Sequence, residues 1–198
     1  MVADPNPSRR PRARNARPKI ERAALKLFVT KSVEAATTRE IAEEAGVSEG
    51  ALYRHYPGKD DLALSLFMET HNRLGRMMIE GFMAGDTLED RLSRAVSAYC
   101  QLADEDWLLF SFHLLSMNKY LPHDIRRDDD PVSITETLIK GLMDSGEIPQ
   151  GDPELLAAMS LGVMTQAGQN KAYNRLPGPM MQHVPAFTRA ILAILKQK

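Results

Sequence analysis

Two short helical segments joined by a very tight turn constrain the fold of this chain more than any other feature. Thr37 and Glu40 form a capping box, in which each side chain satisfies a free backbone N–H group of the first helical turn. The segment that they open ends at Gly46, a residue suited to a left-handed helix cap. Ser48 then caps a second helix over about residues 49–55. Because so short a connection cannot join helices end to end, the pair must cross steeply, as in a helix-turn-helix.

The rest of the chain also has apolar residues at helical spacing, and it has no alternating run long enough for a β-strand. Glycine and proline separate the helical stretches, for example at Pro122 and at residues 177–179. The further helices are expected at about 18–31, 59–84, 87–104, 106–119, 131–144, 152–173 and 180–196. We therefore predict an all-α fold of about nine helices, with an N-terminal three-helix helix-turn-helix domain followed by a larger helical bundle.

Charge is unevenly distributed along the chain, although the net charge is only -1. Residues 1–60 carry 12 Lys and Arg against 8 Asp and Glu, whereas residues 61–198 carry 13 against 18. Residues 1–17 are rich in arginine and proline and poor in apolar side chains, which is typical of a flexible basic arm. We therefore expect this arm, a helix-turn-helix domain at 18–62 that meets a polyanion, and a larger domain at 63–198.

The composition argues against several other classes of protein. A single cysteine, Cys100, cannot form a disulfide scaffold. No apolar run is long enough to cross a membrane, and the N-terminus lacks a secretory signal, so we expect a cytoplasmic protein with no membrane partner. Phosphate-binding loops, nucleophile elbows and paired zinc motifs are also missing. We therefore predict no cofactor and no metal site, and an enzyme is a distant alternative.

The segment TTREIAEEAGVSEGALYRHYPGKDDL (37–62), preceded by IERAALKLF (20–28), resembles the DNA-binding domain of the TetR family of transcriptional regulators. The resemblance implies a repressor that binds a palindromic operator on double-stranded DNA as a homodimer and is released by a ligand. Four residues depart from the family pattern: Ser32 stands in place of glycine, Val33 in place of an aromatic residue, Ala51 in place of threonine, and Gly58 in place of serine or asparagine. Because serine is less suited than glycine to positive φ, we expect a differently shaped loop at Ser32.

The resemblance, applied residue by residue, implies DNA contacts at the start of the second helix, along the third and at the start of the fourth. The implied contacts are Thr38, Arg39, Glu49, Gly50, Ala51, Tyr53, Arg54, His55 and Lys59. Lys59 is expected to bind phosphate, and the methyl group of Ala51 is expected to meet thymine.

Several of these residues have a second interpretation. Arg39 either contacts DNA or forms an ion pair with Glu43. Glu49 either accepts a hydrogen bond from cytosine or only stabilises the first turn of its own helix, where an acidic side chain is favourable. The basic arm either enters a minor groove or adds long-range attraction. Its arginines are Arg9, Arg10, Arg12, Arg14 and Arg17.

The larger domain holds 10 of the 11 methionines, and methionine-rich surfaces adapt to varied apolar shapes. We therefore expect a pocket for a small apolar effector. The candidate pocket residues are Trp107, Phe110, His113, Met117, Met164, Gln166, Asn170 and Tyr173. The last three share one helical face, which equally suits a dimer contact.

The resemblance also implies how the larger domain works. The last two long helices, at about 152–173 and 180–196, would pair across a two-fold axis into a homodimer. The helix at 59–84 would belong to both domains and act as a lever that transmits ligand binding. An alternative is a constitutive structural or nucleoid-associated DNA-binding protein without an effector.

Overall fold

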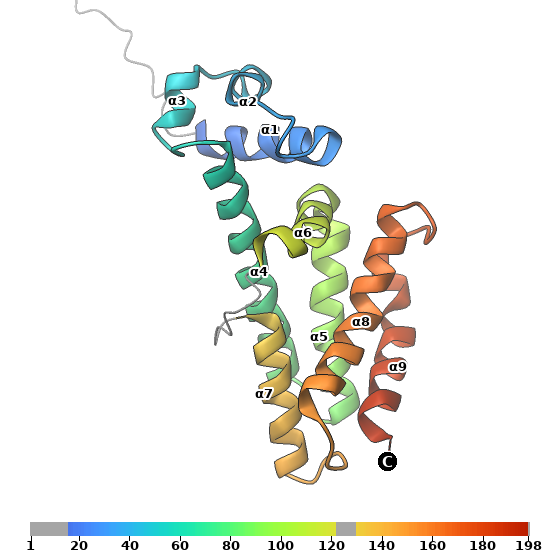
Figure 1. Ribbon diagram of the computed structural model, residues 1–198. Coiled ribbons are helices and arrows are strands. Elements are labelled where there is room, and N and C mark those ends of the chain that lie inside the picture. Colours follow the sequence, from blue (N-terminus) through green and yellow to red (C-terminus); the bar gives the residue numbers. More distant parts are fainter. Residues whose placement is uncertain (1–15, 122–129, 198) are drawn as a thin grey trace, which may run out of the picture. The chain divides into compact units, whose positions relative to one another are not determined.

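The computed structural model describes residues 16–121 and 130–197. In these two stretches all of the regular secondary structure is helical (Figure 1). The predicted all-α fold is therefore confirmed. The predicted arm lies outside the described residues except for Ala16 and Arg17. The helices are α1 (Ala16–Lys31), α2 (Thr38–Ala45), α3 (Glu49–Tyr53), α4 (Lys59–Met83), α5 (Leu88–Glu105), α6 (Trp107–Tyr120), α7 (Pro131–Asp144), α8 (Pro153–Ala172), the 3-10 helix η1 (Met180–His183) and α9 (Val184–Lys196).

The chain divides into two compact units between Ala63 and Leu64, so α4 begins in the first unit and continues into the second. In the first unit, α1 packs against α2 and α3. Ile20, Ile41 and Leu52 are fully buried there and bring one side chain from each helix into the core. Burial of these apolar side chains holds the three short helices together, since none is stable alone at such lengths.

The turn between α2 and α3 has the predicted caps. The Thr37 N–H donates to Glu40 Oε2 at 3.0 Å, and the Glu40 N–H donates to Thr37 Oγ1 at 3.2 Å. Gly46 has a φ of 65°, which is the left-handed conformation expected of it. Local hydrogen bonds, which could be predicted from the sequence, therefore stabilise the helix-turn-helix.

The loop after α1 begins at Ser32. Ser32 has a φ of 78°, and its N–H donates to the Phe28 carbonyl at 3.0 Å. Serine thus adopts the left-handed conformation that glycine favours.

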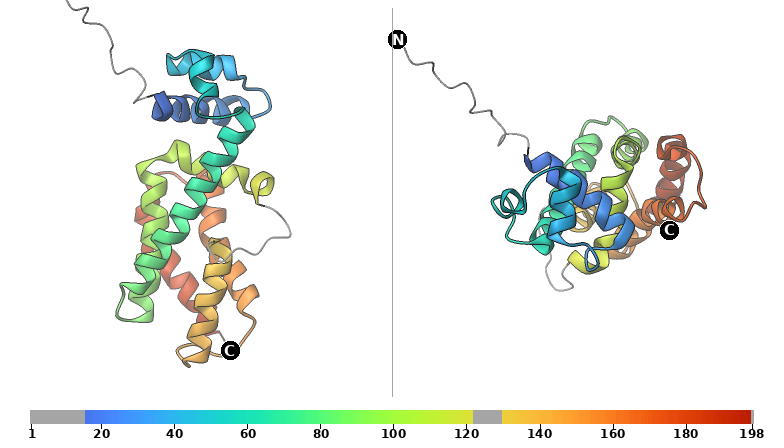
Figure 2. Two further views of the ribbon diagram at one scale, coloured as in Figure 1. Left: turned by 90° about the vertical axis from the view of Figure 1, so that its left-hand side faces the viewer. Right: turned by 90° about the horizontal axis from the view of Figure 1, so that it is seen from above.

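In the second unit, α5 packs against α9, and α8 packs against both α7 and α9. The C-terminal part of α4 runs beside α7, and α6 lies across one end (Figures 1 and 2). The predicted last helix differs from the structure, because residues 180–183 form η1 and α9 begins only at Val184. Pro185 lacks the N–H group that a continuous α-helix needs at that position. Asp104 accepts hydrogen bonds from the Met180 and Met181 N–H groups at 2.7 and 2.9 Å, which caps η1. No helix in the described ranges has the length and apolar character to span a bilayer.

Candidate DNA-binding surface and ligand cavity

Helix α3 presents one polar face to solvent and one apolar face to the core. Ser48 starts the helix by accepting a hydrogen bond from the Ala51 N–H group at 3.2 Å. Leu52 is fully buried, whereas Tyr53 is 52% exposed. Gly50 lies at the open surface, where an added Cβ atom would meet nothing within 4 Å. A duplex can therefore approach the backbone of α3 closely at this glycine.

Three of the predicted DNA contacts lie together where α2 begins beside α3. The Thr38 hydroxyl donates to Glu49 Oε1 at 3.0 Å and lies 3.3 Å from the Tyr53 hydroxyl. Glu49 and Tyr53 are exposed, and Thr38 is half-buried. The cluster thus combines hydroxyl groups, which bind phosphate oxygens, with a carboxylate, which accepts hydrogen bonds from cytosine.

The remaining polar residues around this cluster have different surroundings. Arg39 forms an exposed ion pair with Glu43 at 2.9 Å, and this hydrogen bond raises the pKa of Arg39. The structure thus shows the ion pair that the sequence left open for Arg39. Arg54 and His55 follow α3 directly, and both are exposed.

Lys59 lies at the start of α4 and binds the loop that joins α1 to α2. Its ammonium group donates to the Glu34 carbonyl at 2.7 Å and to the Ala36 carbonyl at 2.8 Å. Two of its three N–H donors are therefore used within the domain. This role was not predicted, and it leaves one donor for the predicted phosphate contact.

Two residues predicted to meet DNA lie differently from expectation. Ala51 is only 7% exposed, because the short helix α3 packs against α1 and α2, so little of its methyl group is open to a base. Arg17 belongs to α1 rather than to an arm, since its guanidinium pairs with Glu21 at 2.6 Å and with the Tyr56 hydroxyl at 3.1 Å. Pro18 still falls in the first helical turn, where its missing N–H group has no partner to lose. The other arginines of the arm lie outside the described residues.

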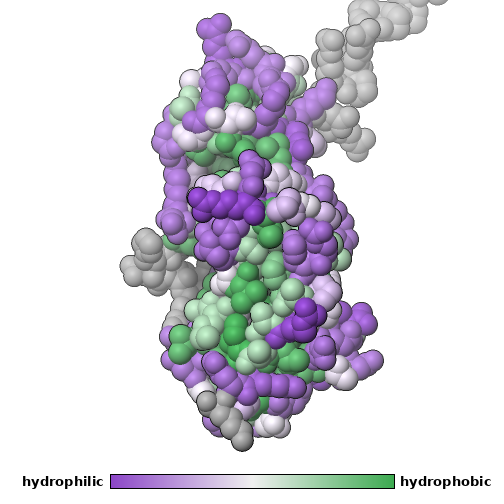
Figure 3. Space-filling model, turned by 90° about the vertical axis from the view of Figure 1, so that its right-hand side faces the viewer, coloured by the Kyte–Doolittle hydropathy of each residue, from purple (hydrophilic) through white to green (hydrophobic). Residues whose placement is uncertain are grey.

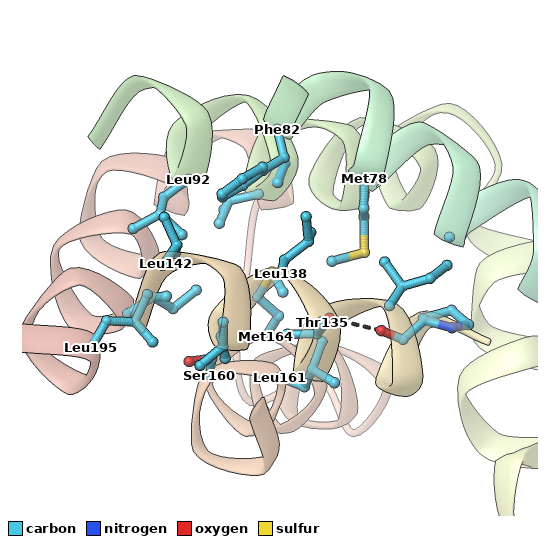
Figure 4. A pocket seen from close by; sticks show the side chains of 17 residues that line it. Met78, Phe82, Leu92, Thr135, Leu138, Leu142, Ser160, Leu161, Met164 and Leu195 are labelled. Atoms are coloured by element: carbon cyan, nitrogen blue, oxygen red, sulfur yellow. Dashed lines mark hydrogen bonds between the residues drawn. The ribbon is translucent and has the colours of Figure 1, made fainter. Parts of the chain in front are cut away.

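The second unit contains an apolar cavity with a volume of about 60 Å³ between α4, α5, α7, α8 and α9 (Figure 4). Its lining is almost entirely aliphatic and aromatic. Thr135 and Ser160 provide the hydroxyl groups of the lining. Prominent apolar members of the lining are Met78, Phe82, Leu138, Leu142, Met164 and Leu195.

Two buried histidines and the half-buried Asp130 form a hydrogen-bonded chain elsewhere in the second unit. His113 Nε2 lies 3.0 Å from His71 Nδ1, and His71 Nε2 lies 2.9 Å from Asp130 Oδ1. Burial, together with the neighbouring His71, lowers the pKa of His113 to about 3. His113 is therefore neutral, and His71 Nε2 donates to the Asp130 carboxylate. Within the described stretches, no three such side chains are grouped as ligands of a metal ion.

Most of the predicted pocket residues do not line the cavity. Met164 does line it, whereas His113 belongs to the histidine chain. Phe110 is fully buried in the core, and Trp107 stacks on it with 5.8 Å between ring centroids. Met117 is partly buried against the same core. The helical periodicity identified these residues as apolar, but it does not show where packing leaves space.

The polar residues predicted for the pocket lie on an outward face of α8. Gln166 is exposed, Asn170 is half-buried and Tyr173 is 61% exposed. The residues that sequence reasoning missed lie mainly on α7, with others on α4, α5 and α9. One signal was available, since Ser160 interrupts an otherwise apolar stretch of α8.

Comparison with known proteins identifies the class. Residues 20–66 match the family model described as bacterial regulatory proteins, tetR family. The fatty acid metabolism regulator protein of Bacillus subtilis (strain 168) is 25% identical over 149 residues, which cover 73% of this chain and 77% of the relative. Three further curated regulators are 34–36% identical, but the chain spans only 32–38% of their length. Each of these relatives is named as a regulator.

Solved structures share the whole fold. A TetR family transcription regulator from Marinobacter aquaeolei VT8 has a TM-score of 0.76 at 18% identity, covering 92% of this chain and 96% of that chain. The regulator FadR from Bacillus subtilis, solved in complex with stearoyl-CoA, has a TM-score of 0.71 at 20% identity, covering 90% and 97%. A helix-turn-helix unit followed by a helical bundle, with these relatives, defines a DNA-binding transcriptional regulator. Residues 20–66 thus match the DNA-binding part of the TetR family of transcriptional regulators, and the fold is that of solved TetR-family regulators.

Proposed function

We propose that this regulator is a homodimeric repressor that binds a palindromic operator and is released by an apolar ligand. The observation that carries the proposal is the surface cluster of half-buried Thr38 with exposed Glu49 and Tyr53, which presents hydroxyl and carboxylate groups beside the open backbone at Gly50. A helix with such a face fits the major groove of B-DNA. One helix-turn-helix offers little contact area, so specific binding calls for two of them on successive half-sites.

An apolar outer face on α8 supports the homodimer. Leu155 and Met159 are 56% and 38% exposed, whereas Leu156 and Met164 on the same helix are buried in the core. A helix that is apolar on two sides requires a second partner. Figure 3 views the side on which α8 and α9 lie, and hydrophobic residues gather in its lower half. We assign this face, with α9, to the contact between two copies.

The cavity supports control by a ligand. Its volume of about 60 Å³ is smaller than the roughly 150 Å³ of a cavity that accepts benzene. A ligand must therefore widen the cavity and stabilise the widened state. Met78 and Phe82 of α4 form part of the cavity wall. The same helix begins at Lys59, within the first unit. Widening would thus act on a helix that both units share, to the extent of the ligand's differential affinity for the two states.

The dimer is tested with an outward-facing apolar residue and a matched control. Met159→Asp places a charge on the proposed contact, whereas Met83→Asp places the same charge at a 69% exposed methionine at the end of α4. Size-exclusion chromatography with light scattering should find a dimer for the wild type and for Met83→Asp, and a monomer for Met159→Asp. The monomer should also lose specific DNA binding. A dimeric Met159→Asp protein would contradict the assignment of this face.

The ligand is tested on a selected operator duplex by fluorescence anisotropy. Saturation with a bound apolar compound should release the duplex. If compounds that demonstrably bind leave the affinity for DNA unchanged, the protein is a constitutive DNA-binding protein, and the ligand-release part of the proposal fails.

A further inference from the structure

Ser160 places an unpaired hydroxyl group in the apolar cavity. Its side chain lines the cavity on α8 and is 95% buried, with a relative exposure of 5%. Its Oγ atom has no hydrogen-bond partner in the structure. Buried hydroxyl groups in proteins are nearly always paired, because an unpaired one loses its bonds to water without replacement. A ligand with a suitable polar atom would restore that bond.

The other hydroxyl group of the lining is already paired. Thr135 Oγ1 donates to the Pro131 carbonyl at 2.7 Å, one turn earlier in α7 (Figure 4). None of the described residues that line the cavity carries a charge. Asp130 directly precedes Pro131, and its carboxylate is bound to His71. The cavity thus offers one hydroxyl group that is free to donate, Ser160, and no counter-ion for an anion.

From this arrangement we infer the chemical class of the ligand. The cavity takes a slender, uncharged and mainly aliphatic group with one hydroxyl or carbonyl oxygen, and that oxygen pairs with Ser160 Oγ. A carboxylate at this position would be buried without a partner, which is far more costly than burying a neutral oxygen. The inference rests on the proposed function insofar as the cavity is the effector site.

Isothermal titration calorimetry on the full chain tests this inference with three six-carbon probes. They are 1-hexanol, n-hexane and hexanoate, which differ only in the polar end. The wild type should bind 1-hexanol at least tenfold more tightly than hexanoate. Ser160→Ala should weaken 1-hexanol binding about fivefold and leave n-hexane binding unchanged, because only the alcohol uses the hydroxyl group. Thr188→Val, which removes another buried unpaired hydroxyl group outside the cavity lining, is the matched control and should bind 1-hexanol like the wild type.

Three results would overturn the inference. They are equal affinity of Ser160→Ala and wild type for 1-hexanol, tighter binding of hexanoate than of 1-hexanol, and no heat of binding with any of the three probes. Direct binding is measured here without DNA. If 1-hexanol binds through Ser160 but does not release operator DNA, the ligand-release part of the proposed function fails while the inference stands.

Discussion

Lys59 is the residue for which structure and sequence predict different consequences of mutation. The sequence predicts a phosphate contact, whose loss would weaken binding to any DNA and reduce the salt dependence by about one ion per subunit. The structure shows two hydrogen bonds from the Lys59 ammonium to the carbonyls of Glu34 and Ala36. We therefore predict that Lys59→Met destabilises the helix-turn-helix unit itself.

The magnitude follows from these two bonds. A hydrogen bond from a charged donor contributes about 1.5–3 kcal/mol when buried. Lys59 is only partly buried, and water can solvate both carbonyls once the lysine is gone, so the contribution must be discounted. We expect Lys59→Met to lower the free energy of unfolding by about 2 kcal/mol.

Urea denaturation followed by circular dichroism measures this change in the full chain. Lys19→Met, at an exposed lysine of α1, removes the same charge and should change the free energy of unfolding by less than about 0.5 kcal/mol. Affinity for a random-sequence duplex at several salt concentrations gives the number of released ions for each variant. If Lys59→Met keeps wild-type stability and loses only one ion of salt dependence, the structural role argued here is wrong.

Two further predictions concern buried residues. Because the pKa of His113 is about 3 in the folded protein and about 6.5 in the unfolded chain, the unfolded state binds more protons between these values. Stability should therefore fall by about 1.4 kcal/mol per unit as pH decreases below 6.5, and urea midpoints should show a flatter dependence for His113→Phe. Ala51→Leu should cost about 1–3 kcal/mol through overpacking and leave the selected DNA sequence unchanged, whereas a changed base preference at normal stability would refute the burial of Ala51.

The parts of the fold that were predictable depend on contacts between residues close in sequence. Thr37 and Glu40 are three residues apart, and Gly46 ends the helix that they begin, so α2 and its neighbours were visible from local chemistry. The resemblance to the family predicted Thr38, Glu49 and Tyr53 as DNA contacts. These side chains lie together because α2 and α3 cross.

The parts that were not predictable depend on packing between distant residues. The carbonyls bound by Lys59 lie 23 and 25 residues earlier in the chain, and no periodicity indicates them. The cavity is formed by five helices, and its position depends on how completely their side chains fill the space between them. Phe110 and Met164 are both buried and apolar, yet only Met164 lines the cavity.

Selection from random duplex DNA is the most direct test of the central claim, that this protein is a dimeric and sequence-specific regulator. The full chain is incubated with the pool at near-physiological salt, and the retained duplexes are sequenced. An inverted repeat with half-site centres about one helical turn apart is the predicted outcome. A retained pool that stays random in sequence would contradict the claim, because it would show that binding depends on charge alone.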